Sequence, residues 1–524
     1  MSAYLSLILH AHLPFVRHPE HEKFLEESWL FEAITETYVP LLQLLERWHR
    51  DGLNPHLTLT LTPTLCSMLH DPLLQGRYER HLNELIELAE KEIHRTQWEK
   101  PLHELALFYH ERFVAVRDAY AAYGRDLVGA FRRFQELGFL EIITSAATHA
   151  LLPLLADHPP SLRAQVLVAR DHYRSCFGCE PRGIWLPECA YVDSLENVLQ
   201  EANLRWFLTD THGILHAKPR PRYATFAPIF TPNGIAAFGR DPDSTRQVWS
   251  RHAGYPGDPR YRDFYRDIGF DLDLDYVKPH LPAPDTRGFT GLKYYRITGS
   301  SPDKEVYDRQ TAILAADNHA GHFLEARVQQ FQRLAEILDR PPILVAPYDA
   351  ELFGHWWYEG PEFLDFLVRE ACCDQKVFEL ITPAEFLSQH ATHQVATPAA
   401  SSWGEDGYWR VWLNEANEWI YPHLRVAQER MTELARRFPQ PDALQERILK
   451  QAARELLLAQ SSDWPFILRT GTSPGYARRR VQDHLLRFTR LYEQLTTGQR
   501  DAEWLAQVEW RDNIFPDVDY RYWT

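Results

Sequence analysis

The most constraining feature of this sequence is a series of short apolar runs that each end in a polar or charged residue. The run at residues 183–187 is followed directly by Glu188, and the run that begins at Ile343 ends at Asp349. Apolar runs of strand length are typical of buried parallel sheets. In such folds functional side chains collect beyond the carboxyl ends of the strands. Glu188 and Asp349 are therefore the first candidates for a functional site.

The apolar runs alternate with segments of helical periodicity through the first two thirds of the chain. We expect strands at residues 4–9, 57–61, 141–144, 183–187, 206–209, 343–348 and 378–381, and helices at 31–50, 161–177, 193–202 and 318–339. This alternation predicts an α/β fold with a mostly parallel sheet that closes into a barrel. Residues 70–137 show helical periodicity only, so we expect a helical insertion between barrel strands.

An irregular segment breaks this rhythm at residues 213–310. Within it, residues 239–262 are rich in Gly, Pro, Asp and Tyr. A long irregular stretch inside a compact domain is usually functional, and we expect this one to form a lid.

The C-terminal part of the chain has a different character. Residues 392–400 have the composition of a linker, and amphipathic helices are expected at 420–436, 441–460, 474–497 and 501–510. The predicted organisation is a barrel domain over residues 1–400 and a helical domain over residues 401–524.

Charge and composition limit the kinds of partner that the protein is expected to bind and indicate its cellular compartment. The formal net charge is −16, and no run of Lys or Arg is longer than residues 478–480, so a nucleic-acid partner is not expected. The N-terminus lacks the pattern of a signal peptide, and no apolar stretch approaches the roughly 18 residues of a membrane span. Six cysteines in 524 residues fit reduced thiols in a cytoplasmic protein.

Histidines follow two of the expected strands. His10 and His12 come after the first strand at alternate positions, so they share a face. His149 follows the strand at residues 141–144. We expect these side chains to converge with Glu188 and Asp349 at the rim of the barrel.

A pair of carboxyl groups at such a rim fits chemistry on a sugar. Glycosidic cleavage needs one carboxylate that attacks or stabilises the oxocarbenium-like carbon and one carboxylic acid that protonates the departing oxygen. Glu351 is a rival to Asp349, because alternate residues of an extended segment share a face.

A metal centre is the alternative interpretation of the same residues. His-x-His after a first strand, with a later His and an Asp, is also typical of barrel metallohydrolases. Cys176 and Cys179 form a Cys-x-x-Cys pair, but no second pair follows at the spacing of a zinc finger.

Tryptophan is concentrated toward the C-terminus, where ten of the sixteen indoles follow residue 355. Most tryptophans belong to cores, but indole faces on loops stack well on sugar rings. Trp403 lies in a Gly-rich loop and is a stronger candidate for such a contact than Trp412. Asp463, between two expected helices, could cap a helix or bind a sugar hydroxyl.

Five segments together carry a resemblance to glycoside hydrolase family 57. They are residues 10–14 (HAHLP), 147–150 (ATHA), 183–188 (GIWLPE), 346–354 (APYDAELFG) and 401–404 (SSWG). They occur in the order of the five sequence regions of that family, and the match runs nearly end to end. The length and the helical C-terminal domain most resemble the family's 1,4-α-glucan branching enzymes.

The resemblance implies an incomplete (β/α)7 barrel with a helical insertion and a retaining mechanism without metal or cofactor. It implies that Glu188 is the nucleophile and Asp349 the acid/base. The remaining implied substrate contacts are His10, His12 and His149 in the donor-sugar subsite, Trp403, Trp412 and Asp463 near the cleavage point, Arg266 after the lid, and Tyr255 as a lid tyrosine that keeps water from the intermediate.

The expected partner is an α-1,4-glucan such as amylose or glycogen, and the oligomeric state is left open, with a monomer compatible. The alternatives are an α-amylase or 4-α-glucanotransferase of the same family, a metal-dependent hydrolase, and a glucan-binding protein without activity.

Overall fold

The computed structural model describes residues 2–249, 254–283, 286–301 and 303–524. The strands are β1 (Tyr4–Ala11), β2 (Leu57–Leu61), β3 (Leu140–Ile143), β4 (Gly183–Ile184), β5 (Trp206–Thr209), β6 (Ile229–Phe230), β7 (Ala236–Gly239), β8 (Ile343–Asp349) and β9 (Glu379–Leu380). They form two sheets, in the orders β3-β2-β1-β8, with β9 beside β1, and β4-β5-β7-β6.

The two sheets join into a ring of seven parallel strands. Between β3 and β4, Thr144 and Ile184 form a parallel bridge. Between β7 and β8, Asp241 N donates to Val345 O over 2.8 Å, just past the end of β7. The order around the ring is therefore β1-β2-β3-β4-β5-β7-β8. The β3–β4 and β7–β8 junctions lack the ladders that the other neighbours share. This arrangement is the predicted α/β fold with an incomplete barrel.

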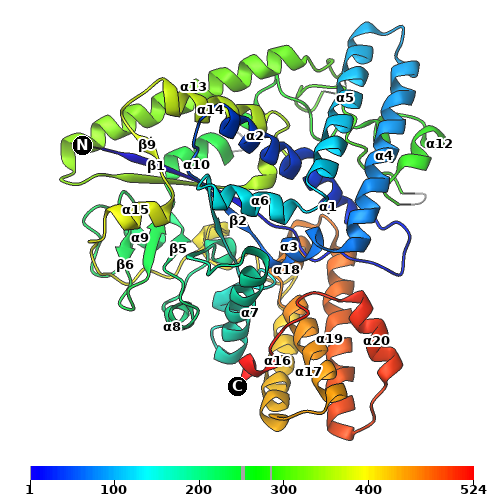
Figure 1. Cartoon of the computed structure of the whole chain (residues 1–524), viewed down its shortest axis with the longest axis vertical. Helices are drawn as coiled ribbons and strands as arrows, with labels where there is room; N and C mark the ends of the chain where they lie inside the picture. The colour runs from blue at the N-terminus through cyan, green and yellow to red at the C-terminus, as the bar shows by residue number, and fades with distance from the viewer. Residues whose placement is uncertain (1, 250–253, 284–285, 302) are drawn as a thin grey trace.

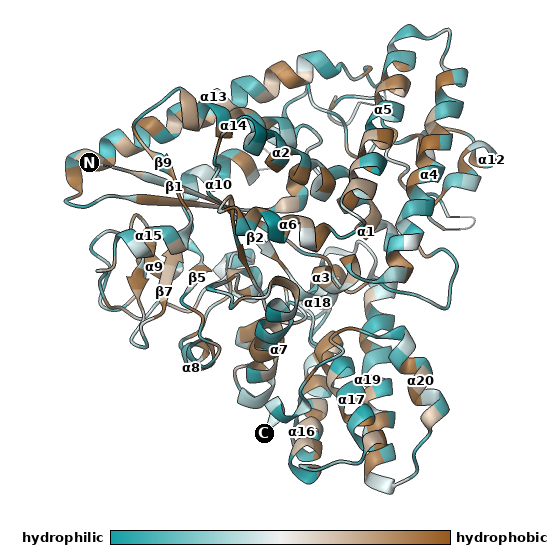
Figure 2. Ribbon diagram, in the orientation of Figure 1, coloured by the Kyte–Doolittle hydropathy of each residue, from teal (hydrophilic) through white to brown (hydrophobic). Residues whose placement is uncertain are grey.

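Alternation along the strands divides the core into an inside and an outside. On β1, Tyr4 and Ile8 belong to the cluster that fills the barrel, together with Trp206 of β5 and Val345 of β8. The intervening leucines, among them Leu7, pack outward against the helices. Both faces of β1 are buried and mostly hydrophobic (Figure 2), as expected for a parallel strand that is covered on both sides.

Helices surround the ring and extend away from it. In the first 400 residues they are α1 (Glu27–Ala33), α2 (Val39–Arg50), α3 (Pro63–Leu69), α4 (Pro72–Arg95), α5 (Lys100–Ala122), α6 (Leu127–Glu136), α7 (Pro159–Phe177), α8 (Glu196–Glu201), α9 (Thr211–Leu215), α10 (Pro242–Trp249), α11 (Ile268–Asp271), α12 (Leu274–Val277), α13 (Arg309–Ile337), α14 (Gly360–Cys373) and α15 (Pro383–Gln389). Figure 1 shows α4 and α5 projecting from the barrel as a long antiparallel pair, so the segment expected to be a helical insertion is helical.

The C-terminal residues form a separate group of helices at the lower right of Figure 1. These are α16 (Ile420–Arg437), α17 (Ala443–Ala459), α18 (Asp463–Thr470), α19 (Pro474–Thr497) and α20 (Ala502–Arg511). The short helix α18 was not expected from the sequence, and it reaches back toward the barrel (Figure 1). Within the described ranges, none of the helices combines the length and the apolar character that crossing a membrane requires.

Several sequence expectations differ from the structure. Residues 213–310, expected to be irregular, contain β6 and β7, and β7 is a ring strand, whereas the strand expected at 378–381 is the short β9 outside the ring. The segment at residues 392–400 has the composition of a linker, but it lies along the barrel, since Lys218 bridges to Thr397 and Phe230 to Val395. The run before Glu188 forms only the two-residue strand β4, because the chain then turns at Pro187.

Gly354, in the loop after β8, is required by a close backbone contact. Its φ is +114°, and a Cβ there would lie 1.8 Å from the carbonyl oxygen of Glu36. Gly354→Ala is expected to cost at least about 3 kcal/mol, because both a strained φ and a fixed backbone atom oppose it. The measurement is the melting temperature of the variant.

Gly52→Ala is the matched control, because its φ is +73° but nothing lies within 4 Å of a Cβ. It should lose only the roughly 1–2 kcal/mol of left-handed strain. Equal losses of melting temperature in the two variants would contradict the role of the contact.

Candidate active site

The rim of the barrel brings the predicted polar residues together because of strand register. His10 of β1 pairs with Asp349 of β8 on one side and with Thr60 of β2 on the other. His10 and Asp349 are therefore neighbours at the same level of the barrel, two residues above the buried layer that contains Ile8. Period-two alternation of the strands places both side chains at the mouth of the interior.

Glu188 sits in a tight turn immediately after β4. Its backbone is in the left-handed region, with φ +63° and ψ +23°, which a residue other than glycine adopts at a cost of order 1–3 kcal/mol. Trp403 stabilises this conformation twice. Its backbone N donates to Glu188 O over 3.0 Å, and its indole Nε1 donates to Glu188 Oε2 over 2.7 Å.

His149 is held in the same way by Ser462, the residue before α18. The φ of His149 is +55°. Ser462 N donates to His149 O over 3.1 Å, and Ser462 Oγ lies 2.9 Å from His149 Nδ1. The same hydroxyl donates to Glu188 Oε1 over 3.1 Å. Glu188 and His149 are thus fixed by residues from beyond position 400.

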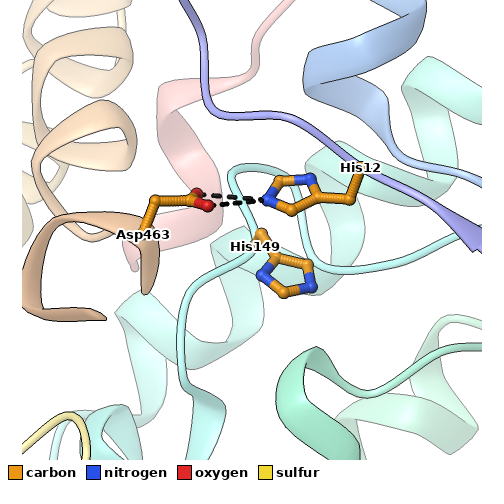
Figure 3. A group of neighbouring side chains, drawn as sticks. All are labelled: His12, His149 and Asp463. Carbon is orange, nitrogen blue, oxygen red and sulfur yellow. Dashed lines mark hydrogen bonds and ion pairs between the residues drawn. The ribbon is translucent and has the colours of Figure 1, made fainter. Parts of the chain in front are cut away.

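Three imidazoles stack against one another at this mouth. His149 lies between His10, with ring centroids 5.1 Å apart, and His12, with centroids 3.8 Å apart. His10 in turn stacks on Trp185 at 4.3 Å. His10 Nε2 lies 3.0 Å from His149 Nε2, and Figure 3 shows His12 directed at Asp463 of α18, with Nε2 3.1 Å from Oδ2.

Asp349 and Glu351 have different environments. Glu351 Oε1 accepts hydrogen bonds from the Tyr38 hydroxyl over 2.5 Å and from His12 N over 3.1 Å. Among the described residues, the Asp349 carboxyl has no comparable donor. Glu351 is thus engaged in holding the rim, and Asp349 is the carboxyl that is free to exchange a proton.

The pKa values of the two candidate catalytic carboxyls, Glu188 and Asp349, are shifted by different causes. Burial, with a smaller contribution from the charge of Asp463, raises the pKa of Glu188 to about 7, although hydrogen bonds from Trp403 and Ser462 oppose that rise. Burial raises the pKa of Asp349 well above its usual range, and the nearby carboxylates of Glu351 and Glu188 add to the effect. Two hydrogen bonds therefore favour the ionised form of Glu188, whereas burial and like charges both favour the protonated form of Asp349.

His10 and His149 are neutral for a physical reason. Burial lowers the pKa of both His10 and His149 well below the usual value, and the neighbouring imidazoles lower it further. Burial works against ionisation of Asp463, but the charge of His12 and its hydrogen bond lower the pKa of that carboxyl below its usual value.

The metal alternative has a geometric basis. His12, His149 and Asp463, drawn in Figure 3, each offer a ligand atom within 4.8 Å of the other two. However, His12 Nε2 is already bonded to Asp463, and both nitrogens of His149 have partners in His10 and Ser462. An ion would have to replace these interactions, so a metal test belongs in any assay of this protein.

Three predicted substrate contacts have side chains that are buried or engaged with other groups. Trp412 is only 1% exposed and packs behind Trp403 with Leu151, so no face of its indole is open to a sugar. Arg266 forms an ion pair with Asp271 at 2.9 Å.

Tyr255 is buried, and its hydroxyl lies 2.7 Å from His322 Nδ1 of α13. Its ring stacks on His319 of the same helix. No described contact joins Tyr255 to the carboxyls. Residues 250–253 of the expected lid lie outside the described residues.

Other residues at the site were not singled out from the sequence. Ser462 lies beside the predicted Asp463 but carries no motif of its own. Trp249, 41% exposed at the end of α10, lies edge-on to Trp403 with centroids 6.0 Å apart. Arg240, paired with Asp210 at 2.6 Å, lies 5.9 Å above the Trp403 ring. Both residues belong to segment 239–262, which was expected to form a lid. That expectation is the sequence feature that could have indicated them.

The raised pKa of Glu188 predicts a gain in stability when its charge is removed. Ionisation of Glu188 is penalised in the folded state by up to about 3 kcal/mol above pH 7, and the penalty vanishes below the unfolded value of 4.5. Glu188→Gln should therefore melt at a higher temperature than the unmodified protein at pH 8, with a difference that closes as the pH falls to 4.5.

The measurement is the melting temperature of both proteins between pH 4.5 and pH 8. Glu415→Gln, which removes an exposed carboxyl, should follow the unmodified protein throughout. A difference that persists at pH 4.5, or is missing at pH 8, would contradict the assigned cause.

Comparison with protein families gives two matches along the chain. Residues 6–399 match the model of glycosyl hydrolase family 57, and residues 423–523 match that of the C-terminal region of 1,4-alpha-glucan branching enzymes. A 1,4-alpha-glucan branching enzyme of Thermococcus kodakarensis is 34% identical over 99% of this chain and 78% of its own length.

Two solved structures are similar to this protein over the whole of its chain. An α-amylase from Thermotoga maritima is 44% identical with a TM-score of 0.93, covering 100% of this chain and 99% of its own. A branching enzyme from Pyrococcus horikoshii is 33% identical with a TM-score of 0.90, covering 100% and 97%. With the family model matched over most of its length, the chain belongs to glycosyl hydrolase family 57.

Proposed function

We propose that this protein is a 1,4-alpha-glucan branching enzyme, which cleaves an α-1,4 bond and transfers the released segment to a 6-hydroxyl to form an α-1,6 branch. One observation carries the proposal. The segment that matches the C-terminal region of branching enzymes contains Ser462 and Asp463, which contact Glu188 and His12 at the mouth of the barrel. The part of the chain typical of branching enzymes therefore completes the site.

In the first step we assign the attack to Glu188. One of its oxygens forms a bond to the anomeric carbon while the bond from that carbon to O4 of the next glucose breaks. The proton of Asp349 passes to that O4, and the shortened chain leaves. The causes of the pKa shifts support these roles, because the nucleophile must be ionised while the acid is protonated: hydrogen bonds from Trp403 and Ser462 lower the pKa of Glu188, and like charges raise that of Asp349.

In the second step the glucan segment moves to an acceptor. The 6-hydroxyl of another glucan chain gives its proton to the Asp349 carboxylate, and its oxygen bonds to the anomeric carbon as the bond to Glu188 breaks. Both carboxyls return to their starting states, and the anomeric configuration is retained. A water molecule in place of the 6-hydroxyl would give hydrolysis.

The substrate contacts that we propose are the groups that face the mouth. They are His10, His12 and His149, with Trp403 and Asp463 from the C-terminal part. The proposed site does not include Trp412, Arg266 or Tyr255, whose side chains are buried or paired elsewhere. We also propose a cytoplasmic location, supported by six free cysteines.

An α-amylase is the second candidate, and one finding favours it. The 44% identical structure from Thermotoga maritima bears that name. An amylase would use the same two carboxyls, so the two activities differ only in whether water or a sugar hydroxyl reaches the intermediate.

The products formed from amylose discriminate between these candidates. A branching enzyme should lower iodine staining while reducing ends barely rise, and a debranching enzyme should then release new short chains. The assay is performed in EDTA and repeated with added zinc. Reducing ends that rise in step with the loss of staining would identify a hydrolase, and activity only with added metal would identify a metal enzyme.

The two carboxyl roles are tested with α-maltotriosyl fluoride, whose leaving group needs no proton. Asp349→Asn should lose at least about 10³-fold on amylose but still release fluoride in an initial burst of about one equivalent per enzyme, because the first step then needs no acid while the second step lacks its base. Glu188→Gln should lose both activities. Measurement of initial rates on both substrates decides the matter, since the reverse pattern would exchange the two roles.

A further inference from the structure

A continuous series of hydrogen bonds leads from His10 to Glu188. It runs from His10 Nε2 to His149 Nε2 over 3.0 Å, from His149 Nδ1 to Ser462 Oγ over 2.9 Å, and from Ser462 Oγ to Glu188 Oε1 over 3.1 Å. Three of its members are at most 3% exposed: His10, His149 and Ser462. The series joins strand β1, the loop after β3, the residue before α18, and the turn after β4.

The direction of each hydrogen bond follows from the ionised state of Glu188. A carboxylate only accepts, so Ser462 gives its one hydroxyl proton to Glu188. The serine oxygen must then accept from His149, whose Nδ1 carries the proton. Because His149 is neutral, its Nε2 accepts from His10 Nε2. This leaves His10 Nδ1 as a bare nitrogen, and it is buried without a hydrogen-bond partner among the described residues, as this proton order allows.

The usual structural role of a serine at this position is absent. Ser462 is the residue at which α18 begins, where a serine hydroxyl commonly accepts from a backbone N–H of the first turn. The Ser462 side chain makes no such hydrogen bond. Its hydroxyl instead lies between His149 and Glu188, while its backbone N is fixed on His149 O. The Ser462 hydroxyl therefore contacts His149 and Glu188 and does not cap α18.

We propose that Ser462 is a positioning residue for the nucleophile: its hydroxyl holds Glu188 in its ionised, oriented form and couples it to the histidine pair that lines the mouth. The inference rests on the proposed function, since it takes Glu188 as the attacking group. Trp403 supplies the second donor, on the other oxygen of the same carboxylate. With one donor on each oxygen, the plane of the carboxylate is fixed.

Other charged and titratable groups also face Glu188 and must stay constant in a test. They are Asp463 of α18, His12 after β1, His149 after β3 and Asp349 of β8. Ser462→Ala leaves all four in place and removes only the hydroxyl. The hydrogen bond from Ser462 is among the groups that lower the pKa of Glu188.

The experiment follows the pH dependence of kcat/KM for fluoride release from α-maltotriosyl fluoride in the full-length protein. Ser462→Ala should lower kcat/KM at the optimum roughly 10- to 100-fold, the range for a hydrogen bond to a charged group. The acid limb, which reports Glu188, should move up by about one pH unit. KM should change little, because Ser462 does not itself contact the sugar, and Ser462→Thr, which keeps a hydroxyl, should restore the limb.

Ser145→Ala is the matched control, because it also removes a buried hydroxyl near the rim, one that donates to Trp185 O over 2.8 Å. It should lower the melting temperature without moving the acid limb. An acid limb in active Ser462→Ala that stays at its original pH would overturn the inference alone, and so would an equal shift in Ser145→Ala. Absence of fluoride release by the unmodified protein would overturn the proposed function and this inference with it.

Discussion

The functional rim of this barrel depends on two residues, His149 and Glu188, whose backbone lies in the left-handed region that favours glycine. Such conformations persist only where surrounding groups hold them. Here each backbone carbonyl accepts a hydrogen bond from an N–H of the C-terminal part, Ser462 for one and Trp403 for the other. The side chains of the same two donors bind the Glu188 carboxylate. One set of contacts therefore stabilises the strained turns and orients the reactive group.

The same contacts also make the environments of the Glu188 and Asp349 carboxyls different. Two buried carboxyl groups that sense each other cannot both ionise easily. The donors from Trp403 and Ser462 favour the charged form of Glu188, whereas Asp349 has Glu351 as a neighbour of like charge. Hydrogen bonds thus favour the ionised form of Glu188, and like-charge repulsion favours the protonated form of Asp349. The neutral, stacked imidazoles beside them add donors and acceptors without adding charge.

The parts of this structure that depend on local periodicity could be predicted from the sequence. Alternation along the first strand correctly placed His10 on the inner face, and the register with β8 makes Asp349 its neighbour. Contacts between distant segments could not be found in this way. The hydroxyl of Ser462 meets a residue 274 positions away, and no local pattern in the sequence marks that contact. Tyr255, expected over the mouth, is held by α13 because of a histidine at position 322.

The sequence distance between the nucleophile and its two donors has a consequence for biogenesis. All the ring strands lie before residue 350, yet Trp403 and Ser462 follow Glu188 by 215 and 274 residues. A nascent chain that has completed its ring still lacks the groups that fix Glu188, so it contains a barrel without a working centre. The site is therefore complete only late in synthesis, when α18 docks, and a product truncated before that helix would lack the Ser462 contacts to Glu188 and His149.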